Sequence, residues 1–264
     1  MSKKISLALS GSGYLFYVHI GAVVALEEKG YTFVELSGTS GGSIIAMLIS
    51  LGFTGQQIKE KAFSQDWSNA MKFRWFAFWD WSSGLCNSDT LYNILLNLSE
   101  NKTLKEAIIP IHIVSTNLTT GHPFIFNSVT MPDTLLAKAC LASASVPFVY
   151  PMTDIDGSKM IDGGVSFDLP LNILSGDNKI AISISSDMPL MSKNVSMLDR
   201  AKRIMELMLA SNSRVEYALA QTENAKIVKV SSLGYSAFDT TLTDTQKQEL
   251  FDEGYNAVKN DPTV

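Results

Sequence analysis

The pentapeptide Gly38-Thr39-Ser40-Gly41-Gly42 lies between two apolar stretches, residues 32–36 and residues 43–49. The first stretch has the length of a short buried strand, and the second has the pattern of a buried helix. A Gly-x-Ser-x-Gly sequence between a strand and a helix is typical of a nucleophile elbow, in which the serine hydroxyl projects from the edge of the sheet. Glycines on both sides leave room for so tight a turn. We therefore predict that Ser40 is a nucleophile, with a glycine-rich turn and an inactive serine as the alternative.

A serine nucleophile needs a base within hydrogen-bond reach, and the sequence offers two kinds. In the usual hydrolase order a histidine follows late in the chain, but His19, His112 and His122 all lie in the first half. Asp162 ends a short apolar run and is followed by two glycines. An aspartate acts directly as a base where burial raises its pKa. We favour Asp162 as the base; a Ser-His-Asp triad and an ordinary Asp-Gly turn remain the alternatives.

A glycine-rich loop, Ser10-Gly11-Ser12-Gly13, follows the predicted strand 4–9 and precedes an apolar helix over residues 15–26. This helix ends in polar residues and a Gly30 cap. A strand, a glycine-rich loop and a helix together form a cradle of backbone N–H groups for an anion. A dinucleotide-binding fingerprint is the competing interpretation, but Phe16 occupies the place of its third glycine. Because the elbow serine lies just downstream, an oxyanion hole is favoured.

Five short blocks occur in one order along residues 4–171, and together they resemble the patatin-like phospholipase family. They are Leu7-Ala8-Leu9-Ser10-Gly11-Ser12-Gly13 with His19-Ile20-Gly21-Ala22-Val23, Gly38-Thr39-Ser40-Gly41-Gly42, Ser115-Thr116-Asn117-Leu118-Thr119-Thr120-Gly121, Ala142-Ser143-Ala144-Ser145-Val146-Pro147, and Asp162-Gly163-Gly164 with Pro170. Each block alone is only modestly specific, whereas their shared order is highly specific.

The resemblance implies an α/β fold, a three-layer α/β/α sandwich with a central, mostly parallel sheet. It also implies a Ser-Asp dyad without histidine that hydrolyses fatty-acyl esters of phospholipids or lysophospholipids. Carried over by position, Ser40 is the nucleophile, Asp162 the base, and the backbone of Gly11, Ser12 and Gly13 the oxyanion hole. An acyltransferase that uses the same acyl-enzyme and a non-catalytic lipid-binding protein are the alternatives.

The sequence departs from the family pattern at two places. Leu15 and Phe16 occupy the positions of a basic residue and a glycine after the loop, and Asp168 stands where the family often has asparagine. Oxyanion contacts come from backbone N–H groups, so the missing cation need not abolish activity. Two environments are open to Asp168: close to Asp162, where it raises the pKa of that carboxyl, or facing solvent.

Composition agrees with an enzyme of this class. The 264 residues contain no linker or repeat, so we expect a single domain over residues 1–264. A net charge of −5 without a basic stripe argues against a nucleic-acid partner. Cys86 and Cys140 fit no metal spacing, and we expect neither a metal nor a cofactor. The first residues imitate a secretory signal, but they also form the predicted first strand, so we expect a cytoplasmic protein, with export by a signal-independent route as the alternative. The oligomeric state is left open.

One segment is unusually aromatic. All four tryptophans and three phenylalanines lie within residues 67–81. We expect residues 64–87 to form a cap over the site, with Trp75, Phe76 and Trp79 in contact with lipid and providing a peripheral membrane contact. The alternative is a core patch that packs a lid over the sheet.

Overall fold

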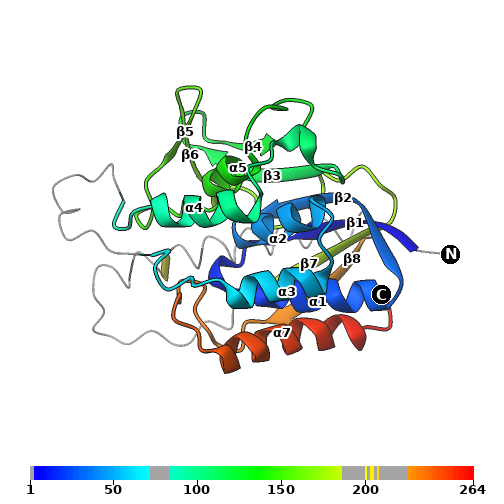
Figure 1. Cartoon of the computed structure of the whole chain (residues 1–264). Coiled ribbons are helices and arrows are strands. Elements are labelled where there is room, and N and C mark those ends of the chain that lie inside the picture. The colour runs from blue at the N-terminus through cyan, green and yellow to red at the C-terminus, as the bar shows by residue number, and fades with distance from the viewer. Residues whose placement is uncertain (1–2, 72–83, 186–199, 201–202, 205–206, 208–224) are drawn as a thin grey trace.

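A mostly parallel sheet forms the centre of the molecule in the computed structural model, which describes residues 3–71, 84–185, 200, 203, 204, 207 and 225–264 (Figure 1). The strand order is β5-β6-β3-β2-β1-β7-β8, and β4 pairs with β3 outside this path. Pairing is parallel from β3 through β8, whereas β4, β5 and β6 pair in antiparallel fashion. The strands are β1 (Lys3–Leu9), β2 (Tyr31–Thr39), β3 (Ile111–Asn117), β4 (His122–Phe126), β5 (Thr153–Ile155), β6 (Ser158–Asp162), β7 (Lys179–Ser185) and β8 (Lys226–Ser231).

The central strands follow from their apolar sequences. β1 pairs with β2 on one side and with β7 on the other, and residues 5–9 are all buried. Such near-continuous burial is expected of a parallel strand covered on both faces. The predicted strands 4–9 and 32–36 are confirmed. β2 continues beyond the prediction to Thr39, because it pairs with β1 as far as Gly38 and with β3 as far as Thr39.

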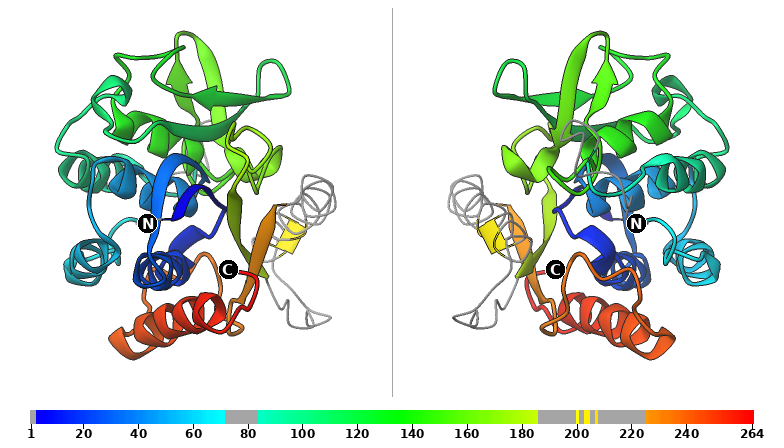
Figure 2. Two further views of the ribbon diagram at one scale, coloured as in Figure 1. Left: turned by 90° about the vertical axis from the view of Figure 1, so that its right-hand side faces the viewer. Right: turned by 90° about the vertical axis from the view of Figure 1, so that its left-hand side faces the viewer.

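Chain segments cover both faces of the sheet. The helices α1, α2, α3, α4, α5 and α7 lie on one side, and residues 163–178 lie on the other (Figure 2). The expected α/β class and three-layer arrangement are therefore confirmed. The helices are α1 (Tyr17–Glu28), α2 (Gly41–Ser50), α3 (Gly55–Ser64), α4 (Asp89–Leu98), α5 (Leu136–Ser143) and α7 (Asp244–Lys259), with 3-10 turns η1 (Gly13–Leu15), η4 (Leu104–Glu106) and η5 (Gly163–Val165).

The two helices α1 and α7 pack against each other at very short range (Figure 1). A Cβ atom on Gly21 of α1 would lie 1.9 Å from the carbonyl oxygen of Phe251, and one on Gly254 of α7 would lie 1.9 Å from that of Val18. A side chain at either glycine would push the helices apart. The sequence Thr243-Asp244 predicts the start of a helix. α7 begins there, and Thr243 forms a capping box with the helix.

Within the described ranges, no helix has the length and apolarity needed to cross a bilayer. Trp75, Phe76 and Trp79 lie outside the described residues, as do residues 72–83 of the expected cap.

Candidate active site

Ser40 occupies a strained turn between β2 and α2. Its backbone has φ 50° and ψ −125°, a left-handed region that non-glycine residues rarely adopt. The Ser40 N–H donates to Ser143 Oγ at 2.8 Å, and the Ser40 carbonyl accepts from Ser43 Oγ at 2.6 Å. Strain of this kind persists only where the surroundings hold it. The predicted elbow conformation is therefore present, fixed by hydrogen bonds at both ends of the residue.

Glycines let the loop at residues 10–13 lie directly against this elbow. A Cβ atom on Gly42 would lie 2.3 Å from the Ser10 carbonyl oxygen, and one on Gly41 would lie 2.3 Å from that of Gly13. On Gly38 it would lie 2.7 Å from the Cα of Ser43. No side chain fits at these three positions without displacing backbone. Gly38 is needed for the tight turn itself, whereas Gly41 and Gly42 also admit the loop.

Asp162 is the last residue of β6 and reaches the elbow from an antiparallel strand. Its Oδ2 accepts a hydrogen bond from Ser40 Oγ at 2.6 Å, and its Oδ1 accepts from the Gly164 N–H at 2.8 Å. The residue is only 2% exposed. This burial raises the pKa of Asp162 to about 6, although the hydrogen bonds from Ser40 and Gly164 act in the opposite direction. The structure thus brings the two residues, 122 positions apart, into direct contact.

The three amides of the glycine-rich loop differ in what they bind. The Gly11 N–H donates to the Asp168 carbonyl oxygen at 3.2 Å. In the part of the chain that the structure describes, the N–H groups of Ser12 and Gly13 have no hydrogen-bond acceptor. A Cβ atom on Gly11 would lie 3.8 Å from Ser40 Cβ, so the loop borders the serine.

The residues that depart from the family pattern are buried. Asp168 is 4% exposed, and its Oδ1 would lie 2.4 Å from a Cβ atom on Gly11, so the solvent-facing alternative for Asp168 is wrong. Leu15 and Phe16 are 3% and 1% exposed. The Phe16 ring packs against Trp67, with ring centroids 4.9 Å apart. A basic side chain at position 15 would point into this core, which explains why an apolar residue occupies it.

The histidines have other partners. His19 Nε2 lies 2.9 Å from the Ser10 carbonyl oxygen, and burial lowers the pKa of His19 to about 4, so this neutral ring donates to the loop. His112 Nε2 lies 3.1 Å from Glu35 Oε1, and His122 is exposed at the start of β4. Among the described residues, no histidine forms a hydrogen bond with Ser40 or Asp162.

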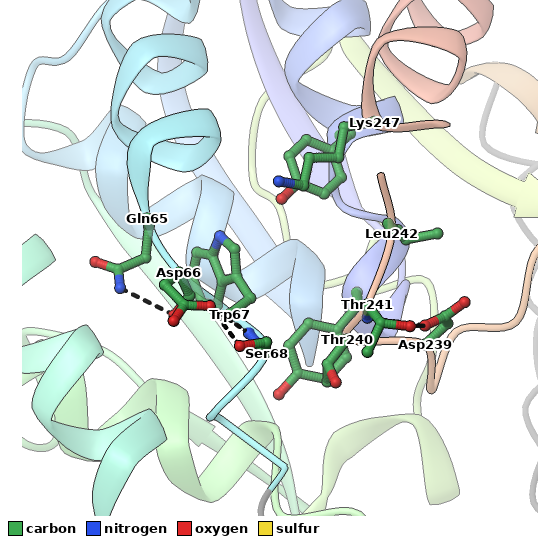
Figure 3. Close-up of a pocket in the computed structure, with 11 residues that line it drawn as sticks. Gln65, Asp66, Trp67, Ser68, Asp239, Thr240, Thr241, Leu242 and Lys247 are labelled. Atoms are coloured by element: carbon green, nitrogen blue, oxygen red, sulfur yellow. Dashed lines mark hydrogen bonds between the residues drawn. The ribbon is translucent and has the colours of Figure 1, made fainter. Parts of the chain in front are cut away.

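Other candidate sites are weaker. A hollow of about 240 Å³ lies between segments 65–68 and 239–242, with parts of η1, α1 and α7 in its walls (Figure 3). Neither Ser40 nor Asp162 lines it. The Asp66 carboxylate at its edge already accepts hydrogen bonds from its own turn (Figure 3). In residues 3–71, 84–185 and 225–264, no cluster of acidic, histidine or cysteine side chains has the composition of a metal site.

Comparison with known proteins places this arrangement in a family. The family model described as patatin-like phospholipase matches residues 7–175. This chain belongs to the patatin-like phospholipase family. The matched residues contain the glycine-rich loop, Ser40 and Asp162, and the family resemblance of the sequence blocks is confirmed.

Sequence relatives of this patatin-like chain are distant and longer than the matched region. Protein R571 of Acanthamoeba polyphaga mimivirus is 30% identical over 182 residues, which cover 61% of this chain and 60% of R571. YqhO of Bacillus subtilis is 28% identical over 59% of this chain and 62% of its own length. Triacylglycerol lipase 5 of Saccharomyces cerevisiae is 27% identical over 58% of this chain but only 23% of the yeast protein. The match therefore spans less than two thirds of these relatives.

Solved structures confirm the patatin-like fold. VipD from Legionella pneumophila superposes with a TM-score of 0.65 at 15% identity, over 97% of this chain and 66% of VipD. The type III effector protein ExoU gives a TM-score of 0.53 at 18% identity, over 98% of this chain and 52% of ExoU. At such low identities, these likenesses show the fold alone.

Proposed function

We propose that this chain is a serine acyl hydrolase that cleaves fatty-acyl esters of phospholipids or lysophospholipids through a Ser40–Asp162 dyad. The observation that carries the proposal is the 2.6 Å hydrogen bond from Ser40 Oγ to Asp162 Oδ2, made from a strained elbow in a patatin-like fold. A weak nucleophile and a buried base in direct contact are the minimum needed for nucleophilic catalysis.

Asp162 serves as the base in both halves of the reaction. It takes the proton of Ser40 as Oγ attacks the ester carbonyl carbon, and it then delivers this proton to the leaving alcohol oxygen as the acyl-enzyme forms. In the second half, Asp162 takes a proton from the attacking water and returns it to Ser40 Oγ as the fatty acid leaves. Its pKa of about 6 suits this exchange, because the carboxylate is mostly ionised at neutral pH and still binds a proton readily.

Backbone N–H groups stabilise the negative charge of the tetrahedral intermediate. We assign its stabilisation to the N–H groups of Ser12 and Gly13, since the Gly11 N–H is engaged by Asp168. The N-terminus of α2, which begins at Gly41, adds the positive end of a helix dipole beside the same oxygen.

A fluorophosphonate probe tests the nucleophile. We expect the probe to label the wild type and to leave Ser40→Ala unlabelled, with ester turnover in that variant reduced at least about a thousandfold. Ser6→Ala is the matched control, because Ser6 is also buried and also donates to a carboxylate, Glu35, at 3.3 Å. Equal labelling of folded Ser40→Ala would overturn the assignment.

Two further measurements refine the activity. A panel of phospholipid, lysophospholipid and triacylglycerol esters identifies the substrate, and addition of an alcohol or thiol acceptor distinguishes hydrolysis from acyl transfer. A wild type that is folded yet neither labelled nor active would instead support a lipid-binding protein without catalysis.

We also propose that Trp75, Phe76 and Trp79 contact aggregated lipid. Replacing the three with serine should lower activity on vesicles far more than activity on a short monomeric ester, which needs only the dyad and the loop. Burial of one aromatic side chain in lipid is worth about 2 kcal/mol of transfer free energy. Equal losses on both substrates, measured at matched folded fraction, would refute this contact.

A further inference from the structure

Residues 143–150, which begin at the last residue of α5, contact all three parts of the proposed site. Ser143 Oγ accepts from the Ser40 N–H at 2.8 Å, so this segment holds the nucleophile. The Ser145 carbonyl oxygen accepts from the Asp162 N–H at 2.9 Å, so it holds the base. Tyr150 Oη lies 2.7 Å from Tyr14 Oη, and Tyr14 directly follows the glycine-rich loop. One short stretch of chain therefore connects parts that are far apart in sequence.

The proton positions in the tyrosine pair can be assigned. Tyr150 Oη lies 2.9 Å from the Ala70 carbonyl oxygen, which can only accept, so the Tyr150 hydroxyl donates to Ala70. The Tyr14 hydroxyl must then donate to Tyr150. Both side chains are buried, and burial raises the pKa of Tyr14 to about 12 and that of Tyr150 further. Both hydroxyls therefore keep their protons throughout the neutral range.

Tyr14 is fixed at both ends. Its backbone N–H donates to the Ala237 carbonyl oxygen at 2.9 Å, while its hydroxyl reaches Tyr150. Gly13 has φ 53°, and a Cβ atom on it would lie 2.2 Å from the same Ala237 oxygen. The loop is thus pressed between Ala237 and the elbow. A shift of the Tyr14 backbone would turn the peptide that joins it to Gly13. The N–H groups of Ser12 and Gly13 would then change direction.

A buried hydroxyl pair is an unexpected way to stabilise this position. Replacing both partners of a buried hydrogen bond with apolar groups of the same shape is often neutral or stabilising. A satisfied polar pair instead specifies one geometry. We therefore expect the two hydroxyls to fix the position of Tyr14 rather than to add stability.

We propose that Tyr14 and Tyr150 are positioning residues that aim the Ser12 and Gly13 N–H groups at the developing oxyanion, an inference that rests on the proposed hydrolase function. A misplacement of about 1 Å in such a site can cost about a hundredfold in rate. The pair acts through the loop and touches no reacting atom.

The test uses Tyr150→Phe, Tyr14→Phe and the double variant with a short soluble ester. Fluorophosphonate titration counts the competent Ser40 sites, so kcat is expressed per titrated site. We expect Tyr150→Phe to lower kcat per site about tenfold with KM unchanged, and the double variant to lose no more than the single variants. Tyr255→Phe is the matched control, because its hydroxyl bonds to Glu28 far from the loop, and its kcat should not change.

The double variant also separates positioning from stability. Tyr150→Phe leaves the Tyr14 hydroxyl without its acceptor and should lower the melting temperature, whereas the double variant removes both hydroxyls and should recover part of that loss. Recovery of stability without recovery of kcat supports positioning. A wild-type kcat per titrated site in Tyr150→Phe or in the double variant would overturn the positioning proposal. It would not contradict the proposed hydrolase function. A wild type without labelling or turnover would remove both proposals.

Discussion

Two serine–carboxylate pairs, one buried and one partly buried, invite comparison, because only the buried pair has the features of a reactive site. Ser40 donates to Asp162 at 2.6 Å, whereas Ser6 donates to Glu35 at 3.3 Å. Glu35 also contacts His112, so this Glu35 cluster contains the serine, acid and histidine of a classical triad. The contacts do not form a relay, however, since the serine and the histidine both bond to the acid and not to each other.

The two acids differ in how well their charge is compensated. Burial acts to raise the pKa of Glu35, but hydrogen bonds from the Ser175 N–H, His112 and the Ser175 hydroxyl outweigh it and lower that pKa. Among the described residues, the Asp162 carboxylate accepts hydrogen bonds only from Ser40 and Gly164, and the effect of burial dominates its pKa. A well-compensated carboxylate holds neighbouring elements together and has little affinity for a proton. An under-compensated one costs stability and is ready to accept a proton.

The largest expected contrast is in activity. Asp162→Asn should lower kcat by about 10²- to 10⁴-fold because it removes the general base, whereas Glu35→Gln should leave kcat per titrated site nearly unchanged. Ester turnover of both variants, measured at matched folded fraction, checks this. A comparable loss of kcat per titrated site in folded Glu35→Gln would contradict the proposed difference between the two acids.

The pH profile should follow Asp162. Because the base must be ionised, kcat should fall about tenfold per pH unit below pH 6, near the raised pKa of Asp162, and should level off above pH 7. The measurement is turnover of a short ester from pH 4.5 to pH 8. A profile that stays flat through pH 6 would contradict a base with this pKa.

Stability should show the opposite contrast. The pKa of Asp162 is raised on folding from 3.8 to about 6, so the wild type loses stability as the pH rises through this interval, and Asp162→Asn does not. The difference in unfolding free energy between the two proteins should shift by about 2 kcal/mol in favour of Asp162→Asn between pH 4 and pH 7. For Glu35, with its lowered pKa, the shift should favour the wild type as the pH rises. Urea titrations at the two pH values measure both shifts, and shifts of the same sign would refute the contrast.

The smallest expected effect concerns the histidines. His112→Gln and His122→Gln should keep kcat per titrated site within about twofold, because His112 belongs to the Glu35 cluster and His122 is exposed. His112→Gln should lower stability modestly by removing a partner of Glu35. Either folded variant being as inactive as Asp162→Asn would restore the triad interpretation.

Much of the fold and of the candidate site could be predicted, because short local sequence patterns encode them. The elbow is encoded by the glycines around Ser40, the strands by apolar runs, and the start of α7 by the Thr243 cap. Local patterns are less accurate at element ends. The predicted helix over residues 15–26 begins instead at Tyr17, because the turn η1 intervenes after Gly13.

Contacts between residues far apart in the chain leave no such local signal in the sequence. Tyr14 and Tyr150 are 136 positions apart, and nothing in either neighbourhood indicates the other. The partners of Glu35 come from three other segments, so sequence alone does not show why its pKa falls while that of Asp162 rises. The family block around Ser143 marked its importance without revealing that its hydroxyl holds the Ser40 N–H.

The contact between Ala237 and the loop has a consequence for the order of events during synthesis. The family match ends at residue 175, but the Ala237 carbonyl that fixes Tyr14 is made much later. A ribosome will have released Ser40 and Asp162 from its tunnel well before this contact can form. The nascent chain therefore carries Ser40 and Asp162 for a time without the Ala237 contact that fixes the loop, and translation itself delays the completion of the proposed site.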